Sequence, residues 1–567
     1  MTLLFSSDRP GPAGSASHAG AADTVDAVVI GSGPNGMTAA NVLADAGWSV
    51  LVLEAQPEPG GAVRSAELVE PGFISDMFSA FYPLGIASPV LTSLHLEEHG
   101  LEWAYSPSVV ANPDRDGRCA YVSLDIDETA ASLDSYAPGD GDAWRRLTTL
   151  FRQVQEPLID ALLGPFPPIG AGARIASRLG PSDLLRFARF AVLPVRRMAD
   201  EEFRGKGGGL LLGGNALHSD LGPESPISGF MGWLLCMLGQ TVGFPAPVGG
   251  AGALTAALVR RLESRGGTVT CNSPVEEILV RDGRARGVRL ANGGEVLVRR
   301  AVVADVAAPS LYLDLLPRDE VPGRVLHDIK RFQFDNGTFK VDWTLDGSIP
   351  WTAEAAGGAG TIHLARDMDH LTDVSAQLSK QLIPSDPYLI LGQMTTTDPT
   401  RSPAGTETVW AYSHVPQVPK GDAGADGITG RWDEREVEAY VRRMEDQIEQ
   451  LAPGFRDRVR GRHVMSPNTL QDENGNLISG ALGGGTAQLH QQLVFRPTPG
   501  LAGPRTFLPG LYLGSSSTHP GGGVHGANGG NAAHAALQDV TALGAARRFG
   551  ANLGRALDRR IQERQRV

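Results

Sequence analysis

The fold is decided near the start of the chain by residues 25–36, which read VDAVVIGSGPNG. The segment 27–30 is short, apolar and rich in Val and Ile, which is typical of a buried parallel strand. Gly31, Gly33 and Gly36 then follow with the G-x-G-x-x-G spacing. Such glycines allow a tight turn, a close approach of pyrophosphate to the backbone, and close packing of a helix on the strand. The pattern predicts a dinucleotide-binding turn.

The residues after this turn continue the pattern. We expect a helix over about residues 35–46 that ends at Gly47 and directs its N-terminal N–H groups at the phosphates. A second apolar strand over 50–53 ends at Glu54, which lies 18 residues after Gly36. An acid about 20 residues beyond the turn is the usual ligand of a ribose hydroxyl. A glycine motif alone is weak, and a glycine turn in another α/β domain is the alternative, but these four elements together predict dinucleotide binding.

Composition excludes several classes of protein. The chain has 567 residues, 42% hydrophobic and 20% charged, which is ordinary for a globular protein with a large core and allows about three or four domains. Its net charge of −13, without a dense Lys/Arg block, disfavours nucleic-acid binding. Cys119, Cys236 and Cys271 are far apart and form neither a C-x-x-C pair nor a zinc spacing, so we expect no metal and a reducing, cytoplasmic location.

The sequence allows contact with a membrane surface but does not require it. Residues 1–24 are rich in Gly, Ala and Ser, lack the pattern of a secretory signal and are expected to form a flexible tail. No run of about 18 apolar residues predicts a spanning helix. A helix expected over 181–198 combines apolar residues with four arginines, as a peripheral membrane helix does, but it fits equally well as a core helix with solvated arginines.

The order of elements divides the chain into alternating segments. We expect nucleotide-binding parts at 25–116, 244–310 and 481–567, and two parts of a substrate domain at 117–243 and 311–480. The first substrate part is mostly helical, with helices at 142–161, 181–198 and 227–239 and an apolar stretch, 230–238, that suits either a pocket wall or a buried helix. Further strands are expected at 268–271, 275–280, 284–290, 295–298, 301–304, 337–343, 388–395 and 408–414, and further helices at 253–265 and 432–451.

The end of the chain repeats the arrangement of its start. A short strand, 510–514, leads into the glycine-rich loop 515–531, and a helix is expected over 531–548. A helix N-terminus after such a loop can face an electron-rich ring as well as a phosphate. This repetition predicts one domain assembled from both ends of the chain.

These blocks together resemble the phytoene desaturase-like family of FAD-dependent oxidoreductases, within the wider amine-oxidase-like flavoprotein group. The resemblance rests on GSGPNG at 31–36, Glu54 with the glycine pair 60–61, PVGGAGAL at 247–254, and THPGGG at 518–523, and it spans nearly the whole chain after residue 24. The branch looks similar to the pyridine nucleotide-disulfide oxidoreductase domain-containing protein 2 type and to carotenoid ketolase-like members. The chain nevertheless has no redox cysteine pair.

The resemblance implies an α/β fold with a Rossmann-like FAD-binding domain assembled from three chain segments, plus an α+β substrate domain with a sheet and a helical roof. It also implies FAD, bound noncovalently because no cysteine stands in the glycine-rich loop, with His519 or His525 as a less favoured covalent anchor. The cofactor-binding residues that it implies are Gly31, Ser32, Gly33, Pro34, Asn35, Gly36, Glu54, Ala55, Gly61, Ala62, Val63, Arg64, Val275, Gly514, Val524, His525, Gly526 and Asn528.

The chemistry that the resemblance implies is hydride removal from a substrate C–H to flavin N5, with reoxidation by oxygen or a quinone. The first hypothesis is desaturation or oxidation of an apolar, isoprenoid or carotenoid-like substrate, as in carotenoid biosynthesis. The second is an amine or small-metabolite oxidase with an aromatic cage, and the third is a flavin-bound regulatory protein with weak turnover. His519, His525 and Lys340 are the candidate polar assistants, although each suits a purely structural role as well.

Overall fold

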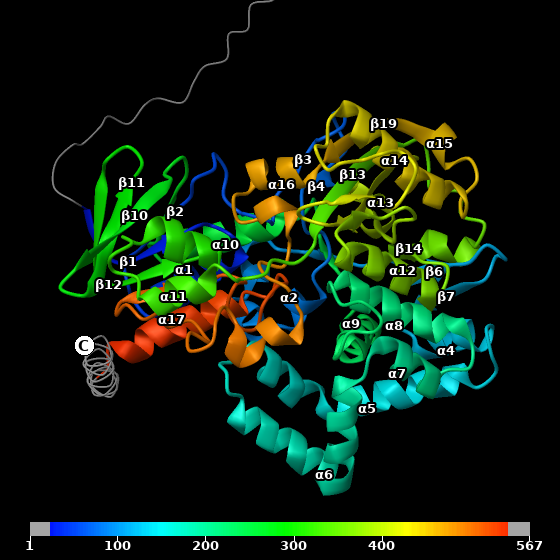
Figure 1. Ribbon diagram of the computed structural model, residues 1–567, viewed down its shortest axis with the longest axis horizontal. Coiled ribbons are helices and arrows are strands. Elements are labelled where there is room, and N and C mark those ends of the chain that lie inside the picture. The colour runs from blue at the N-terminus through cyan, green and yellow to red at the C-terminus, as the bar shows by residue number, and fades with distance from the viewer. Residues whose placement is uncertain (1–22, 542–567) are drawn as a thin grey trace, which may run out of the picture.

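Two seven-stranded sheets organise the protein in the computed structural model, which describes residues 23–541 (Figure 1). The first sheet has the order β10-β11-β12-β1-β2-β9, with β20 paired to β12. Its strands are β1 (Asp23–Ile30), β2 (Val50–Leu53), β9 (Thr268–Thr270), β10 (Val275–Arg281), β11 (Arg284–Leu290), β12 (Glu295–Ala304) and β20 (Leu511–Leu513). Because these strands come from three separate segments, the expected FAD-binding architecture is confirmed.

Three helices cover one face of the first sheet: α1 (Pro34–Asp45), α10 (Gly252–Ser264) and α17 (Ala527–Asp539). Helices α1 and α17 touch so closely that a Cβ atom on Gly529 would lie 1.8 Å from the carbonyl oxygen of Asn35. The beginning and end of the described chain therefore pack as one unit. Helix α17 begins four residues earlier than expected, and the expected residues 542–548 of that helix lie outside the described residues.

The expectation of two strands at 295–298 and 301–304 was wrong, because β12 is continuous. Its first half pairs antiparallel with β11, and its last three residues pair parallel with β20. Its pairing with β1 runs along both halves, and an irregularity between Val25 and Ala27 on β1 absorbs the change of register. The polar pair Arg299–Arg300 thus interrupts the apolar pattern without interrupting the strand.

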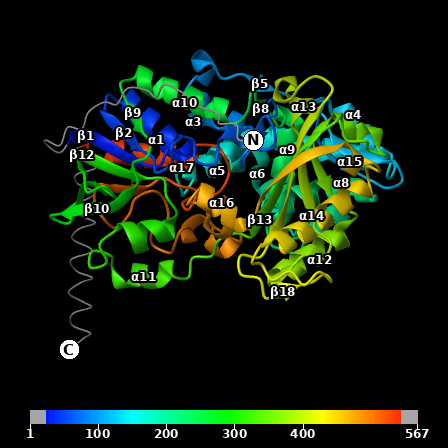
Figure 2. The same cartoon turned by 90° about the horizontal axis from the view of Figure 1, so that it is seen from above.

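The second sheet has the order β19-β13-β17-β16-β14-β6-β7 and lies beside the first (Figure 2). Its strands are β6 (Ser108–Pro113), β7 (Cys119–Val122), β13 (Gly337–Leu345), β14 (Ala359–Leu364), β16 (Leu389–Gln393), β17 (Glu407–Val415) and β19 (Val459–Met465). Helix α14 (Glu434–Glu449) covers one face, and α8 (Lys206–His218) with α12 (Met368–Ser379) packs on the other. Because β6 belongs to this sheet, the chain enters the substrate domain before the boundary expected at residue 116.

A helical layer lies below the second sheet in Figure 1. It consists of α4 (Ile126–Asp134), α5 (Asp140–Leu163), α6 (Ile169–Val192), α7 (Val195–Glu202), α8 and α9 (Ser228–Val242). The single helix expected over 181–198 was wrong: α6 starts earlier, changes direction at Gly180 (φ 73°), and ends before Pro194. Helix α8 was not expected at all.

The remaining elements are short connections between these layers. They are β3 (Ser65–Ala66), β4 (Ser75–Asp76), β5 (Trp103–Ala104), β8 (Ala246–Pro247), β15 (Leu382–Ile383), β18 (Gly421–Asp422), α2 (Pro83–Ala87), α3 (Pro89–Thr92), α11 (Gly323–Ile329), α13 (Met394–Thr397), α15 (Phe455–Arg458) and α16 (Pro467–Glu473). The tail expected over 1–24 overlaps β1 by two residues, and the rest of it lies outside the described residues. Within residues 23–541, no helix has the length and apolar character needed to cross a bilayer.

Candidate functional site

A cavity of about 990 Å³ extends from the glycine turn after β1 to the second sheet. Its wall includes residues from β1, α1, β2, β10 and the end of β12 on one side, and from α8, α9, β13 and β17 on the other. The loop before α17 closes part of it. This volume and this position, at the carboxyl ends of the parallel strands, are typical of a cofactor and substrate site.

The glycine turn forms the first part of the cavity wall through Gly33, Pro34 and Asn35, the last two of which begin α1. A Cβ atom on Gly33 would lie 2.8 Å from the carboxylate of Asp305, and one on Gly36 would lie 2.2 Å from the carbonyl oxygen of Gly31. Side chains are therefore excluded at both positions. The N-terminal end of α1, with its positive dipole end, opens on the cavity as an anion site requires.

Asp305 follows β12 and supports this turn. Its carboxylate accepts a hydrogen bond of 2.8 Å from the backbone N–H of Gly36 and lines the cavity. Burial raises the pKa of Asp305 to about 7, and the nearby charge of Glu54 adds to the rise. Asp305 could not be predicted from the sequence, because nothing in the local sequence shows that β12 lies next to β1.

Glu54 joins the end of β2 to the glycine turn. Its Oε2 accepts hydrogen bonds from the backbone N–H of Ser32 (2.9 Å) and from the Ser32 hydroxyl (2.6 Å), and its Oε1 accepts one from the backbone N–H of Gln56 (2.9 Å). Glu54 is buried but lines the cavity together with Ala55 and Val275. The carboxylate therefore holds the turn in place and presents its remaining lone pairs to the cavity.

The loop after β2 packs on the glycine turn. A Cβ atom on Gly61 would lie 2.9 Å from the Cα atom of Gly33, so the two backbones touch. Gly61, Ala62 and Arg64 all line the cavity. Arg64 donates hydrogen bonds to the carbonyl oxygens of Gly61 (3.2 Å) and Glu473 (2.8 Å), which fixes a cationic side chain at the cavity wall.

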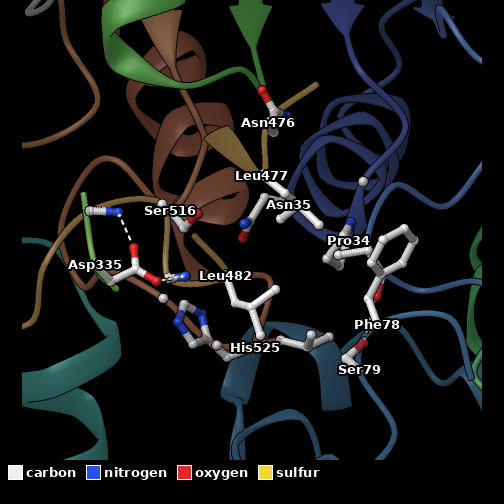
Figure 3. A pocket seen from close by; sticks show the side chains of 18 of the residues that line it. Pro34, Asn35, Phe78, Ser79, Asp335, Asn476, Leu477, Leu482, Ser516 and His525 are labelled. Carbon is white, nitrogen blue, oxygen red and sulfur yellow. Dashed lines mark hydrogen bonds between the residues drawn. The ribbon is translucent and has the colours of Figure 1, made fainter. Parts of the chain in front are cut away.

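The glycine-rich loop before α17 contributes Val524 and His525 to the same cavity, and Figure 3 shows His525 and Asn35 around one space. His525 Nδ1 accepts a hydrogen bond of 3.1 Å from the backbone N–H of Ala527. Burial lowers the pKa of both His519 and His525 to about 4, so both imidazoles are neutral at pH 7. His519 also lines the cavity, against the ring of Phe166.

Six of the expected cofactor residues stand behind the cavity wall instead of in it. Ser32 and Gly36 hold Glu54 and Asp305 as described above, and Gly514 donates a hydrogen bond of 2.8 Å to the carbonyl oxygen of Ala304. The others are Val63, whose carbonyl accepts from Thr255; Gly526, which precedes α17; and Asn528, which donates to the carbonyl oxygen of Thr518. These residues position the wall. Any contact of theirs with a cofactor stays a prediction.

Lys340 does not line the cavity, and we remove it from the catalytic candidates. Its side chain is buried and its ammonium forms an ion pair with Asp342 on the same strand, β13. The structural alternative for Lys340 was a solvated residue on a strand, and that expectation was also wrong, because Lys340 is 3% exposed and Asp342 is fully buried. The pair neutralises itself and leaves no free amine for chemistry.

The far side of the cavity is lined by an apolar wall from α9, which we call the α9 wall: Phe230, Met231, Leu234 and Leu235. Leu162, Leu163 and Val192 from α5 and α6 extend it. The apolar stretch 230–238 thus forms a pocket wall and a buried helix at once, since other residues of α9 are buried in the core. Such a wall suits an apolar ligand.

Polar residues that the sequence analysis missed line the cavity beside the second sheet: His218, Asp220, Asp335, Thr338, Tyr412 and His414. Burial raises the pKa of Asp220 to about 7, with a contribution from Asp335. Asp335 accepts hydrogen bonds from the backbone N–H groups of Gly483 (2.7 Å) and Gly485 (3.1 Å) (Figure 3). No local motif unites these residues, because they lie on α8, β13, β17 and the adjoining loops.

Comparison with known proteins places this site in a family. Residues 35–336, more than half of the chain, match the family described as flavin containing amine oxidoreductase. The chain belongs to this family. It is an FAD-dependent oxidoreductase of the amine oxidase and desaturase superfamily.

Two curated relatives match nearly the whole chain. Pyridine nucleotide-disulfide oxidoreductase domain-containing protein 2 of Rattus norvegicus is 28% identical, over 91% of this chain and 94% of its own length. Phytoene desaturase (neurosporene-forming) of Cereibacter sphaeroides is 26% identical, over 89% of this chain and 93% of its own length. An oxidoreductase structure from Methanosarcina mazei superposes with a TM-score of 0.58 at 15% identity, covering 90% of this chain and 99% of that one.

The residues present fit FAD on structural grounds alone. The glycine turn excludes side chains, Asn35 Oδ1 is buried without a hydrogen-bond partner among residues 23–541, and Glu54 and Arg64 line the cavity. These groups offer an anion site, a carboxylate for a ribose hydroxyl and a cation beside them. When bound, FAD supplies the hydride-accepting N5 atom that this polypeptide lacks.

Proposed function

We propose that the protein removes a hydride from an apolar substrate of isoprenoid or carotenoid type, and thereby desaturates or oxidises it. The observation that carries this proposal is the α9 wall, which shares one cavity with the glycine turn. An apolar molecule that fills this part of the cavity expels water from it, and transfer of apolar surface from water is favourable by about 25 cal/mol per Å². The similarity to a relative named phytoene desaturase agrees with such a substrate.

The residues of this chain act on the reaction by binding, orientation and exclusion of water. Hydride removal from a C–H bond leaves a carbocation, which becomes an alkene when the neighbouring carbon loses a proton. A carbocation gives up this proton readily, so no strong base is needed. The neutral His519 and His525 are candidates for accepting that proton, but a pKa near 4 makes each a weak base at pH 7. Their positions in the cavity wall suit a shaping role equally well.

Anaerobic reduction of the bound flavin tests the proposal. The FAD-loaded protein is mixed with carotenoid precursors and, separately, with primary amines, and the absorbance of the oxidised flavin is followed. We expect bleaching by the carotenoid precursors and none by the amines. Bleaching by amines alone would refute the proposal. Flavin that no member of a broad panel reduces would favour the third hypothesis, a regulatory role.

An amine oxidase is the second candidate, because one observation favours it. Trp410 and Tyr412 stack with their ring centroids 6.0 Å apart at an interplanar angle of 19°, and both line the cavity with Phe81. Aromatic faces can bind a cationic amine. The same spectroscopic experiment separates this candidate from the first.

We also propose that the substrate enters from an apolar phase such as a membrane surface. Val192, Leu489 and Leu493 line the cavity, yet their exposed fractions are 55%, 42% and 39%. The arginines of the 181–198 segment give less support, because Arg189 and Arg197 pair with Glu201. Sedimentation with phospholipid vesicles should carry the protein down, and Leu493→Ser should reduce the bound fraction. Oxygen or a quinone is the proposed electron acceptor.

A further inference from the structure

A polar recess lies in the cavity wall opposite the purely apolar lining. We define it by five residues that all line the cavity: His218, Asp220, Thr338, Tyr412 and His414. Thr338 on β13 and His414 on β17 are direct partners in the antiparallel pairing, so their side chains stand next to each other on one face of the sheet. The rings of Tyr412 and His414 are 5.8 Å apart, and those of His218 and Tyr412 are 6.1 Å apart. The recess is thus one continuous surface.

Three atoms of the recess are buried and lack a hydrogen-bond partner among the described residues: Thr338 Oγ1, His414 Nδ1 and His218 Nδ1. The side chains of Thr338 and His414 are only 2% and 7% exposed. A buried polar atom without a partner destabilises the folded protein. Neighbouring atoms of this kind in a cavity wall indicate that a bound group completes them.

The hydrogen-bonding roles of His414 Nδ1 and Thr338 Oγ1 can be assigned. His414 Nε2 lies 3.0 Å from the carbonyl oxygen of Leu217, which can only accept, so Nε2 carries the proton. Burial lowers the pKa of His414 to about 4, so the ring is neutral and its Nδ1 is an acceptor. Thr338 Oγ1 can donate and accept. The missing partner must therefore donate to His414 and can accept from Thr338.

Asp220 contributes a carboxylate to the recess. Its carboxylate accepts hydrogen bonds from the backbone and the side-chain amide of Asn336, which directly precedes β13. Asp335 lies close enough to interact electrostatically with Asp220. This local negative field disfavours a carboxylate as the ligand.

We propose that the recess binds a hydroxyl group carried by an otherwise apolar substrate, an inference that rests on the proposed function. A hydroxyl donates one hydrogen bond and accepts others, which matches His414 Nδ1 and Thr338 Oγ1 together. An ammonium group donates only and would leave the Thr338 hydroxyl proton without an acceptor. An ether oxygen accepts only and would leave His414 Nδ1 unpaired.

Binding of a matched ligand series to the FAD-loaded protein without oxygen tests the recess. The series consists of 1-decanol, decyl methyl ether, decylamine and decanoic acid, and calorimetry gives each affinity. We expect the alcohol to bind about tenfold more tightly than the ether, because loss of one buried hydrogen bond costs about 1.4 kcal/mol. Equal affinity of alcohol and ether, tighter binding of the amine or the acid, or no binding of the alcohol would overturn the proposal.

A pair of threonine variants localises the effect. Thr338→Val keeps the side-chain shape and removes the hydroxyl, and it should weaken 1-decanol binding about three- to tenfold. Decyl methyl ether should weaken by a similar factor, because its oxygen also accepts from Thr338. Thr361→Val is the matched control, since Thr361 also lines the cavity but stands on β14, three strands or about 14 Å from β13. Equal losses in both variants would overturn the assignment to the recess.

The ligand series also separates this proposal from the proposed function. Calorimetric preference for the alcohol does not depend on turnover. If the preference is found and no carotenoid precursor or alcohol reduces the flavin, the recess is retained and hydride removal from such substrates is rejected. If flavin is reduced by apolar precursors and the alcohol and ether bind equally, the function is retained and the recess is rejected.

Discussion

Replacement of Glu54 by glutamine is expected to weaken FAD binding strongly. Three hydrogen bonds end on this carboxylate, two from Ser32 at 2.9 and 2.6 Å and one from the backbone N–H of Gln56 at 2.9 Å. A glutamine amide places an NH₂ group where one carboxylate oxygen accepts. At least one buried donor then faces another donor, at a cost of about 1–3 kcal/mol. We therefore expect the Kd for FAD to rise roughly 10- to 100-fold.

Titration of the apoprotein with FAD, followed by flavin fluorescence, measures this change. Glu58→Gln is the matched control, because it removes the same charge from the same loop at an exposed position. FMN lacks the adenosine part of FAD, so its affinity separates two roles of Glu54. If the carboxylate contacts the adenosine ribose, Glu54→Gln weakens FAD far more than FMN.

Two results would contradict this reasoning. Unchanged FAD affinity in Glu54→Gln would show that the carboxylate neither holds the glycine turn nor meets the cofactor. Equal weakening of FAD and FMN would leave Glu54 as a support of the Ser32 turn and would remove its assignment to the ribose.

Three further outcomes are expected. Acid precipitation should release all flavin into the supernatant, because none of the three cysteines lines the cavity within residues 23–541; flavin retained on the precipitate would contradict noncovalent binding. Gly214→Ala should lower the free energy of unfolding by about 1–3 kcal/mol in denaturant titrations, since its Cβ would lie 2.5 Å from His363 Nδ1, whereas Gly172→Ala, with open space around it on α6, should be neutral or stabilising. Burial lowers the pKa of His218 to about 4, below the value of about 6.5 in an unfolded chain, so its contribution to stability is full above pH 6.5 and is lost as the pH falls toward 4. When the pH falls from 7 to 5, the free energy of unfolding of His218→Gln should therefore decrease by about 2 kcal/mol less than that of the parent protein. If the free energy of unfolding has the same pH dependence in both proteins, the lowered pKa of His218 is refuted.

The FAD-binding end could be predicted from the sequence because its determinants are local. The backbone of a strand–turn–helix unit leaves room only for glycine at Gly31, Gly33 and Gly36, and the structure shows the close contacts that exclude a Cβ atom at each position. The acid at the end of the second strand follows from the same unit. Asp305 escaped prediction although it bonds to Gly36, because 269 residues separate the two in sequence.

Helix α8 could not be predicted because its sequence has a low intrinsic preference for helix. Its sequence KGGGLLLGGNALH contains five glycines, and each costs up to about 1 kcal/mol relative to alanine in a helix. Tertiary packing reverses the balance. A Cβ atom on Gly208 would lie 2.5 Å from the ring of Phe203, and one on Gly213 would lie 2.9 Å from Leu371. The glycines let the helix approach its neighbours, which cannot be read from the helix itself.

Strand β13 explains both the wrong assignment of Lys340 and the missed recess. Thr338, Lys340 and Asp342 alternate with apolar residues, which is typical of a strand with one face in solvent. All nine residues of β13 are instead buried, because helices and loops cover both faces of this sheet. A polar side chain on a covered face must find a partner or line a cavity.

The two outcomes occur on the same face of β13. Lys340 forms an ion pair with Asp342, two residues along the strand, and is therefore not available for the reaction. Thr338 lies opposite His414 on the neighbouring strand and keeps an unpartnered hydroxyl at the cavity. The sequence places both residues on one face but does not say where the cavity begins along it. Helix α8 sets that limit, because the carbonyl oxygen of Leu217, near the end of α8, contacts His414 Nε2. If the recess binds the substrate hydroxyl as proposed, substrate specificity depends on the packing of the glycine-rich helix α8 on a polar strand face, apart from the motifs that bind the cofactor.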